Sequence, residues 1–435
     1  MSKFEKGSLK LRNAWAFYDW ANSVYSLVIA SSIFPIFYGA LFAKYGLETI
    51  SVFGSQIRST PLITYTTAAA FLIVAFLSPL LSGIADYVGN KKKFMKFFCY
   101  LGALSCMALY FFSLEYIYLS LFIYFLALVG FWGSLVFYNS YLPDVAFKEQ
   151  QDSLSAKGFS LGYIGSVLLL LFNLVMVLKP ELFGITGEDA GIQAMKISFV
   201  TVGIWWIGFS QYTFYCLPSG TTSLKKVNKD VFLNGFKELK QVQQSLSENI
   251  QLKRFLVAFF VYSMAVQTVM LVATYFGEQE VNWGNSDKKT IGLISSILII
   301  QLVAVVGSYV TSKASSRFGN ITTLIFINCV WLVLCIAAYF VTQPIEFYIT
   351  AGFVGLVMGG IQALSRSTYS KFLPDTKDTT SYFSFYDVSE KIGIVVGMLV
   401  YGFVDQITGS MRNAILFLVL FFIVGAILLL RVPRK

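Results

Sequence analysis

The chain has 435 residues, of which 56% are hydrophobic and only 13% are charged. Soluble proteins carry about 25% charged residues, so the composition excludes a soluble protein and predicts one embedded in a membrane. The absence of histidine excludes histidine-based metal sites and histidine proton shuttles.

Long apolar runs recur along the whole chain. A membrane-spanning helix needs about 20 mostly apolar residues. The runs are continuous, whereas the strands of a membrane barrel alternate between apolar and polar residues. We therefore predict an all-α membrane protein with twelve transmembrane helices. The predicted spans are 14–43, 62–85, 94–114, 116–140, 157–179, 195–217, 254–277, 290–312, 321–341, 346–370, 382–404 and 411–431.

The first span contains a carboxylate. Asp19 lies in the stretch Asn13–Gly39, with Asn22 and Ser23 close by. A charged side chain at the centre of a membrane helix costs about 2.5–3.5 kcal/mol on insertion scales, so such groups usually face a bundle interior or a water-filled cavity. Asp19 and Asn22 share one helix face and are candidate substrate or coupling residues. The alternative is that Asp19 only reaches interfacial water or caps a neighbouring helix.

Basic residues gather in alternate loops between the predicted spans. Lys91–Lys93 follow the second span, and the loop after the sixth span adds Lys225, Lys226 and Lys229. Because cytoplasmic loops are rich in lysine and arginine, both termini are expected in the cytoplasm. This asymmetry explains the net charge of +10 without a nucleic-acid partner.

The two halves of the chain repeat each other. The pair Gly89-Asn90 returns as Gly319-Asn320, and Leu142-Pro143-Asp144 returns as Leu373-Pro374-Asp375, at nearly the same separation. Two six-helix halves around a central cavity form a transporter architecture. We predict halves at 1–217 and 254–435. The segment 218–253 is expected to be a cytoplasmic linker with an amphipathic helix; a plain linker is the alternative.

The loop after the second span reads PLLSGIADYVGNKKK. It resembles the signature of the major facilitator superfamily at Asp86, Gly89 and Lys91, although Ser82 stands where that signature has its first glycine. The resemblance implies a latch that closes the cytoplasmic side; a generic turn with cytoplasmic lysines is the alternative. Glycine permits the tight turn, and the carboxylate can lie near a helix N-terminus. The second half has Ser316 in place of the aspartate, so we expect a weaker latch there.

Longer segments resemble a narrower group within this superfamily. They read WAFYDWANSVYS, FYNSYLPDVA, SAKGFSLGYIGS, GGIQALSRSTYSKFLPD and SFYDVSEKIGIVVG. They are similar to a bacterial branch related to the vacuolar amino-acid effluxers of fungal autophagy. The resemblance covers nearly the whole chain and implies a secondary transporter in a bacterial inner (plasma) membrane, without assigning its substrate.

Other polar residues in the spans are candidates for a functional site or for contacts between helices. Asp387 and Lys391 are spaced to form an ion pair on one helix face, and with Glu390 they are also candidates for a coupling or gating site. Arg366 is expected to be a cytoplasmic gate or a headgroup contact rather than a ligand-binding group. The amides of Asn139, Gln267 and Gln362 are candidate substrate contacts, with hydrogen bonding between helices as the alternative.

The function predicted from these features is secondary transport of a small solute by alternating access. Amino acids or short peptides are the first expectation, with protons or sodium as the coupling ion. The alternatives are an exporter of amphiphilic compounds or lipids, and a membrane sensor that does not transport. The sequence has no nucleotide-binding loop and no catalytic constellation, so we expect a monomeric non-enzyme without a cofactor or metal.

Overall fold

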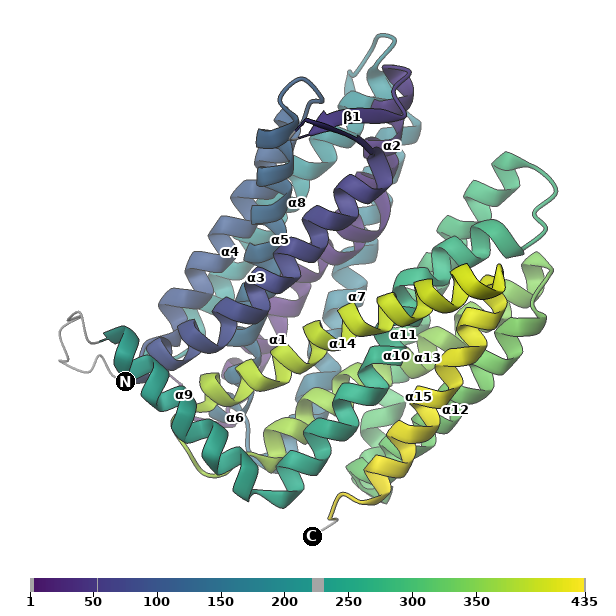
Figure 1. The fold of residues 1–435 in the computed structure, drawn as a ribbon. Coiled ribbons are helices and arrows are strands. Elements are labelled where there is room, and N and C mark those ends of the chain that lie inside the picture. The colour runs from purple at the N-terminus through teal and green to yellow at the C-terminus, as the bar shows by residue number, and fades with distance from the viewer. Residues whose placement is uncertain (1–3, 53, 221–230, 434–435) are drawn as a thin grey trace.

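The computed structural model describes residues 4–52, 54–220 and 231–433. Lys225, Lys226 and Lys229 lie outside the described residues. Twelve helices among the described residues are long and apolar enough to cross a membrane, which confirms the predicted number of spans. They form two groups of six, one from each half of the chain (Figure 1).

The first half begins with a span built from three consecutive pieces. These are α1 (Leu9–Val24), a π-helical segment (Tyr25–Ile33) and α2 (Phe34–Lys44). The other first-half spans and their short continuations are α3 (Ser59–Val88), α4 (Lys91–Ala108) with a 3-10 turn (Leu109–Phe111), α5 (Ile117–Ser140), α6 (Leu142–Val145), α7 (Lys148–Leu178) with a 3-10 turn (Pro180–Phe183), and α8 (Ala190–Cys216).

Each span of the second half is one uninterrupted helix. Its spans are α10 (Ile250–Glu280), α11 (Ser286–Phe318), α12 (Asn320–Phe340), α13 (Pro344–Phe372), α14 (Thr379–Thr408) and α15 (Met411–Leu430). The Asn249 side chain caps the first of these helices by accepting a hydrogen bond from the Leu252 amide at 3.0 Å.

A helix occupies much of the segment expected to join the halves. It is α9 (Val231–Glu248), which packs against α3. The Tyr382 hydroxyl of α14 donates to Ser245 Oγ of α9 at 2.8 Å, and Val242 is buried. The helix therefore lies against both halves at the end of the molecule where the termini are found (Figure 1).

A small β-hairpin was not predicted from the sequence. β1 (Thr49–Val52) pairs with β2 (Ser55–Arg58) in antiparallel register, with Ile50 opposite Ile57. The hairpin lies at the end of the molecule away from the termini (Figure 1). Because it is only four residues per strand, it lacks the long periodic pattern that reveals a strand in sequence.

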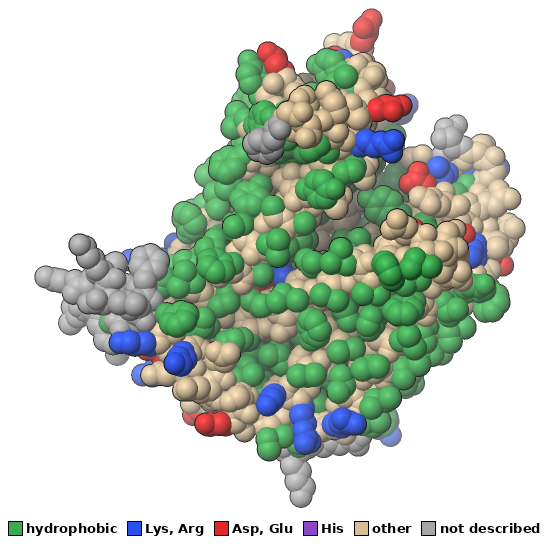
Figure 2. All heavy atoms as spheres, in the orientation of Figure 1, with side chains coloured by type: hydrophobic (Ala, Val, Ile, Leu, Met, Phe, Trp, Pro, Cys, Tyr) green, Lys and Arg blue, Asp and Glu red, His purple; other side chains and the backbone are tan. Residues whose placement is uncertain are grey.

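The halves meet along two seams and separate at one end. At one seam α14 packs against α3 and α5, and at the other α7 packs against α11 and α13. The ends of the halves opposite the termini diverge (Figure 1). The space-filling view shows a hollow between them and hydrophobic side chains along the flanks (Figure 2). The apolar flanks suit a lipid environment, and the hollow leads toward the centre of the molecule.

Candidate functional site

Hydrogen bonds join the two halves from the centre of the molecule to the end that carries the termini. Along the α7 seam, Ser155 Oγ donates to the carbonyl of Ala363 at 2.7 Å, and Ser160 Oγ lies 2.7 Å from Ser308 Oγ. Tyr163 donates to Gln362 Oε1 at 2.9 Å. These bonds close the halves on this side and place Gln362, a predicted candidate, at their interface.

A buried ion pair lies at the centre of this interface. Arg366 of α13 donates through Nη2 to Asp19 Oδ2 of α1 at 3.2 Å, although the two residues are 347 positions apart. Their side chains are only 4% and 6% exposed. Tyr138 of α5 donates to the same carboxylate oxygen at 2.8 Å. Asp19 therefore connects a first-half helix directly to a charge supplied by the second half.

Arg366 has further partners that stabilise its buried guanidinium group. Its Nε donates to Ser155 Oγ at 2.9 Å, and its Nη1 donates to Asn139 Oδ1 at 3.3 Å. The guanidinium carbon lies 4.2 Å from the ring centre of Phe159 and 4.8 Å from that of Trp15. Pairing, hydrogen bonds and aromatic faces together offset the cost of burying the cation. This burial rules out the headgroup contact that was one expectation for Arg366.

A glycine provides the space for this ion pair. A Cβ atom at Gly158 would lie 2.3 Å from Asp19 Oδ2, 3.0 Å from Arg366 Nη2 and 3.3 Å from the Tyr138 hydroxyl. One turn along the same helix, a Cβ at Gly162 would lie 2.4 Å from Ser23 Oγ. Helix α7 thus approaches α1 closely enough that any larger side chain at 158 displaces the charged groups.

We expect Gly158→Ala to disrupt the ion pair and to lower both transport and the melting temperature. Forcing an extra carbon into a packed interior costs about 1–3 kcal/mol. Gly208→Ala is the matched control, because a Cβ at Gly208 meets nothing within 4 Å. Thermal unfolding of the two purified variants checks this, and equal melting temperatures and transport rates would contradict it.

A second charged cluster lies on α14. Lys391 Nζ is 2.6 Å from Asp387 Oδ1 and 2.9 Å from Glu390 Oε2, which confirms the contact predicted from the i, i+4 spacing. Ser78 of α3 donates to Asp387 Oδ2 at 3.1 Å. Gln267 donates to Glu390 Oε1 at 3.0 Å, and Lys391 lies 3.9 Å from the ring centre of Trp132. Glu390, at 19%, is the most exposed of the three charged side chains.

The predicted latch residues lie where α3 meets the start of α14. Asp86 accepts hydrogen bonds from the backbone amides of Thr380 at 3.3 Å and Ser381 at 2.7 Å. These amides belong to the first turn of α14, where the unpaired donors and the helix dipole favour an anion. Gly89 has a φ of 69°, a left-handed conformation that ends α3 and turns the chain.

Lys91 follows this turn and reaches across to the other half. Its ammonium group forms an ion pair with Asp144 at 2.6 Å and donates to Thr379 Oγ1 at 2.8 Å. It also donates to the carbonyl of Ser140 at 2.9 Å. Lys91 therefore ties the first-half loops to the first residue of α14, next to the contact made by Asp86.

The two remaining residues are Asn22, a candidate substrate or coupling residue, and Ser316, where a weaker latch was expected. Asn22 is buried, and its amide nitrogen has no hydrogen-bond partner among the residues that the structure describes. Ser316 is exposed and donates to the carbonyl of Lys313 in its own helix at 2.8 Å, so its side chain makes no latch like that of Asp86. Its neighbour Ser315 instead contacts Asp152 of the first half at 3.2 Å.

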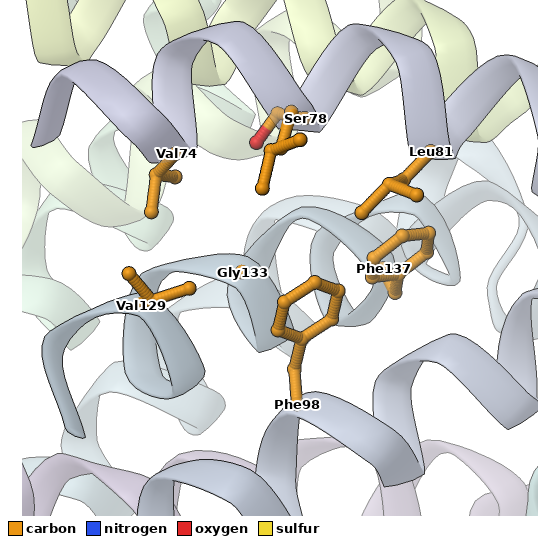
Figure 3. Close-up of a pocket in the computed structure, with 8 residues that line it drawn as sticks. Val74, Ser78, Leu81, Phe98, Val129, Gly133 and Phe137 are labelled. Atoms are coloured by element: carbon orange, nitrogen blue, oxygen red, sulfur yellow. The ribbon is translucent and has the colours of Figure 1, made fainter. Parts of the chain in front are cut away.

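Two pockets are lined mainly by apolar side chains within single halves. In the first half, Val74, Ser78 and Leu81 of α3 face Val129 and Phe137 of α5 (Figure 3). In the second half, a pocket lies around Trp331, Phe347 and Val354. Neither lining contains a charged residue. The two charged clusters, rather than these pockets, therefore form the candidate site for a polar solute.

Comparison with known proteins decides the family. Residues 8–435 match the family described as vacuole effluxer Atg22 like. The chain belongs to the Atg22-like family. The chain is also 33% identical to the uncharacterized MFS-type transporter YxiO of Bacillus subtilis (strain 168), over 98% of this chain and 95% of that protein. It is 23% identical to autophagy-related protein 22-1 of Phaeosphaeria nodorum, over 87% of this chain and 77% of that protein.

Solved structures share the fold of this Atg22-like chain. A crystal structure of the E. coli fucose:proton symporter FucP matches with a TM-score of 0.68 at 15% identity, covering 98% of each chain. This likeness confirms the predicted major facilitator fold. Together with the MFS-type relative, it identifies the chain as a multi-pass membrane transporter of the major facilitator type.

Several residues of the site were missed when the sequence was read alone. Trp15, Tyr138, Ser155 and Phe159 surround Arg366, and Gly158 makes room for it. All five lie inside segments that resemble the Atg22-like family, and Arg366 lies inside another. Membership of these segments was the signal in the sequence that could have revealed the site, because the segments that resemble the family meet in space around one ion pair.

Proposed function

We propose that this chain is a secondary transporter that carries a small solute through a central site by alternating access. The observation that carries the proposal is the asymmetry of the interface. Hydrogen bonds and an ion pair join the halves toward the termini, while the opposite ends diverge around a hollow. This arrangement corresponds to one end state of a rocking motion, closed on the side of the termini.

The Asp19–Arg366 pair supplies a mechanism for switching between the end states. Protonation of Asp19 removes the negative charge that holds Arg366 across the interface. The halves then lose a direct electrostatic contact, and the closed side can open. Asp19 is thus the proposed site of a coupling proton, and the α14 cluster with Gln267 and Gln362 is the proposed solute contact.

The solute we propose is neutral or zwitterionic, such as an amino acid or a short peptide. Both signs of charge lie in the α14 cluster: in the proposed bound state Lys391 pairs with a carboxylate of the solute, and Glu390, the most exposed of the three charged side chains, pairs with an ammonium group. The relation to the family described as vacuole effluxers agrees with the movement of a solute across a membrane. The protein is proposed to act as a monomer.

Uptake into liposomes tests this function. Purified protein is reconstituted, and radiolabelled amino acids and dipeptides are offered under an imposed proton gradient, a sodium gradient or no gradient. We expect accumulation under the proton gradient that an ionophore abolishes. Protein-dependent uptake of none of these solutes would overturn the proposed substrate class, and accumulation that follows only the sodium gradient would overturn proton coupling.

We propose that the side bearing the termini faces the cytoplasm of a bacterium with the spans in its plasma membrane. The uneven distribution of lysine and arginine supports this orientation. Lys240 lies exposed on α9 and reports on this side. In a Cys329→Ser background, which removes the exposed cysteine, we expect Lys240→Cys to resist an impermeant thiol reagent in intact cells. Rapid labelling there, matching that of Glu188→Cys at the other end, would reverse the orientation.

A further inference from the structure

Asp152 forms a second set of contacts between the halves. It lies near the start of α7 and is buried, with a side chain 11% exposed. Its Oδ1 accepts a hydrogen bond from Asn320 Nδ2 at 2.9 Å, and its Oδ2 accepts from Ser315 Oγ at 3.2 Å. Lys371 forms an ion pair with the same carboxylate. All three partners belong to the second half.

This cluster occupies the position that the internal repeat assigns to a second latch. Gly89-Asn90 follows α3, and Gly319-Asn320 stands at the corresponding turn between α11 and α12. At the first turn, the end of α3 supplies the carboxylate of Asp86, and α14 supplies the donors. At the second turn, Ser316 replaces the aspartate, and Ser315 at the end of α11 and Asn320 at the start of α12 supply donors instead.

We propose that Asp152 is a gating residue for transport and forms a second latch of reversed polarity. Its carboxylate comes from α7, which faces the turn between α11 and α12, rather than from the helix that ends at that turn. The inference rests on the proposed alternating access. Asp86 closes the seam between α3 and α14, and Asp152 closes the seam between α7 and α11. Both seams must open when the halves rock, so both carboxylates hold the same closed state.

The two latches differ in their partners, and this difference makes the second one separately testable. Asp86 binds neutral backbone amides of α14, whereas Asp152 pairs with a lysine. Asn320, at the start of α12, also donates to Thr368 Oγ1 of α13 at 2.9 Å, so the cluster includes α13 as well as α11 and α12. The double variant Asp152→Lys, Lys371→Asp inverts the pair and preserves the attraction between opposite charges. The Asn320 amide can adapt to this inversion, because it can turn its oxygen toward the ammonium group.

The test measures distances between spin labels on the two halves. Lys93→Cys and Arg317→Cys place labels at exposed positions on the side of the termini, in a Cys329→Ser background. We expect Asp152→Asn to raise the ratio of open to closed molecules on this side about tenfold, the scale of one charge-assisted hydrogen bond. Lys371→Met should give the same shift, and the inverted pair should restore the closed distribution.

Controls separate the failure of this latch from the failure of alternating access. Asp189→Asn makes the same charge change in an exposed ion pair within the first half and should shift nothing. Opening in Asp86→Asn, without a shift in Asp152→Asn or Lys371→Met, would overturn the second latch alone. A distribution that no latch variant, proton gradient or transported solute changes would overturn alternating access itself. Melting temperatures of every variant establish that each one is folded.

Discussion

Asp19→Asn is expected to abolish proton-driven accumulation of solute while solute counterflow without a gradient continues. The amide cannot ionise, so the step that couples a proton to the Arg366 contact is lost. The substituted side chain keeps one acceptor for the Tyr138 hydroxyl, which now lies 2.8 Å from the carboxylate. Parallel assays of proton-driven uptake and counterflow in liposomes check this result, and normal proton-driven accumulation in the variant would remove Asp19 from the coupling mechanism.

The same substitution should lower thermal stability, because it leaves Arg366 as an unpaired buried charge. Removing one partner of a buried ion pair costs about 3–5 kcal/mol in soluble proteins. We expect a loss toward the lower end, since Arg366 keeps its bonds to Ser155 and Asn139. The double variant Asp19→Asn, Arg366→Gln should recover most of the stability but not the coupling. Recovery of both would reduce the pair to a structural role.

Asp86→Asn is expected to leave the protein folded and to slow transport by destabilising the closed side. The carboxylate accepts from two amides at the start of α14, and hydrogen bonds to a charged group contribute about 1.5–3 kcal/mol. The amide retains one acceptor oxygen and loses the charge. Because about 1.4 kcal/mol changes an equilibrium tenfold, the open population should rise by about that factor.

Two measurements on this variant separate a latch from a generic turn. The melting temperature should remain near the wild-type value, and the solute uptake rate in liposomes should fall. Asp144→Asn removes a carboxylate in the same region whose ion-pair partner, Lys91, lies in the same half. It is expected to have the smaller effect. An unchanged uptake rate in Asp86→Asn, with an unchanged distance distribution between the halves, would show that the motif is only a turn.

The spans and the latch motif could be predicted because their signals are local. An apolar run long enough to cross a membrane is visible in the sequence alone, and the twelve predicted spans match the twelve in the structure. The Asp387–Lys391 contact follows from helical spacing within one helix. Gly89 is likewise a local requirement, because its left-handed conformation suits glycine.

The partners of the buried charges could not be predicted, because they depend on how distant helices pack. Asp19 was identified as unusual by its position in an apolar span, but its partner Arg366 lies on the tenth span and was expected to be a gate or a headgroup contact. Asp152 was missed because it stands in a polar stretch at the start of a helix, where a carboxylate is ordinary. Its role becomes visible only when Asn320 and Lys371 are seen beside it.

We propose that the side of the termini and the opposite side of the molecule open in alternation. The most direct measurement uses two pairs of spin labels, all at exposed positions. Lys93→Cys and Arg317→Cys form the first pair, on the side of the termini. Glu188→Cys and Ile345→Cys form the second pair, at the opposite end. Distances are recorded in the Cys329→Ser background with and without a proton gradient and a transported solute. We expect the first pair to separate as the second pair approaches. Simultaneous widening of both pairs, or distances that never change, would contradict it.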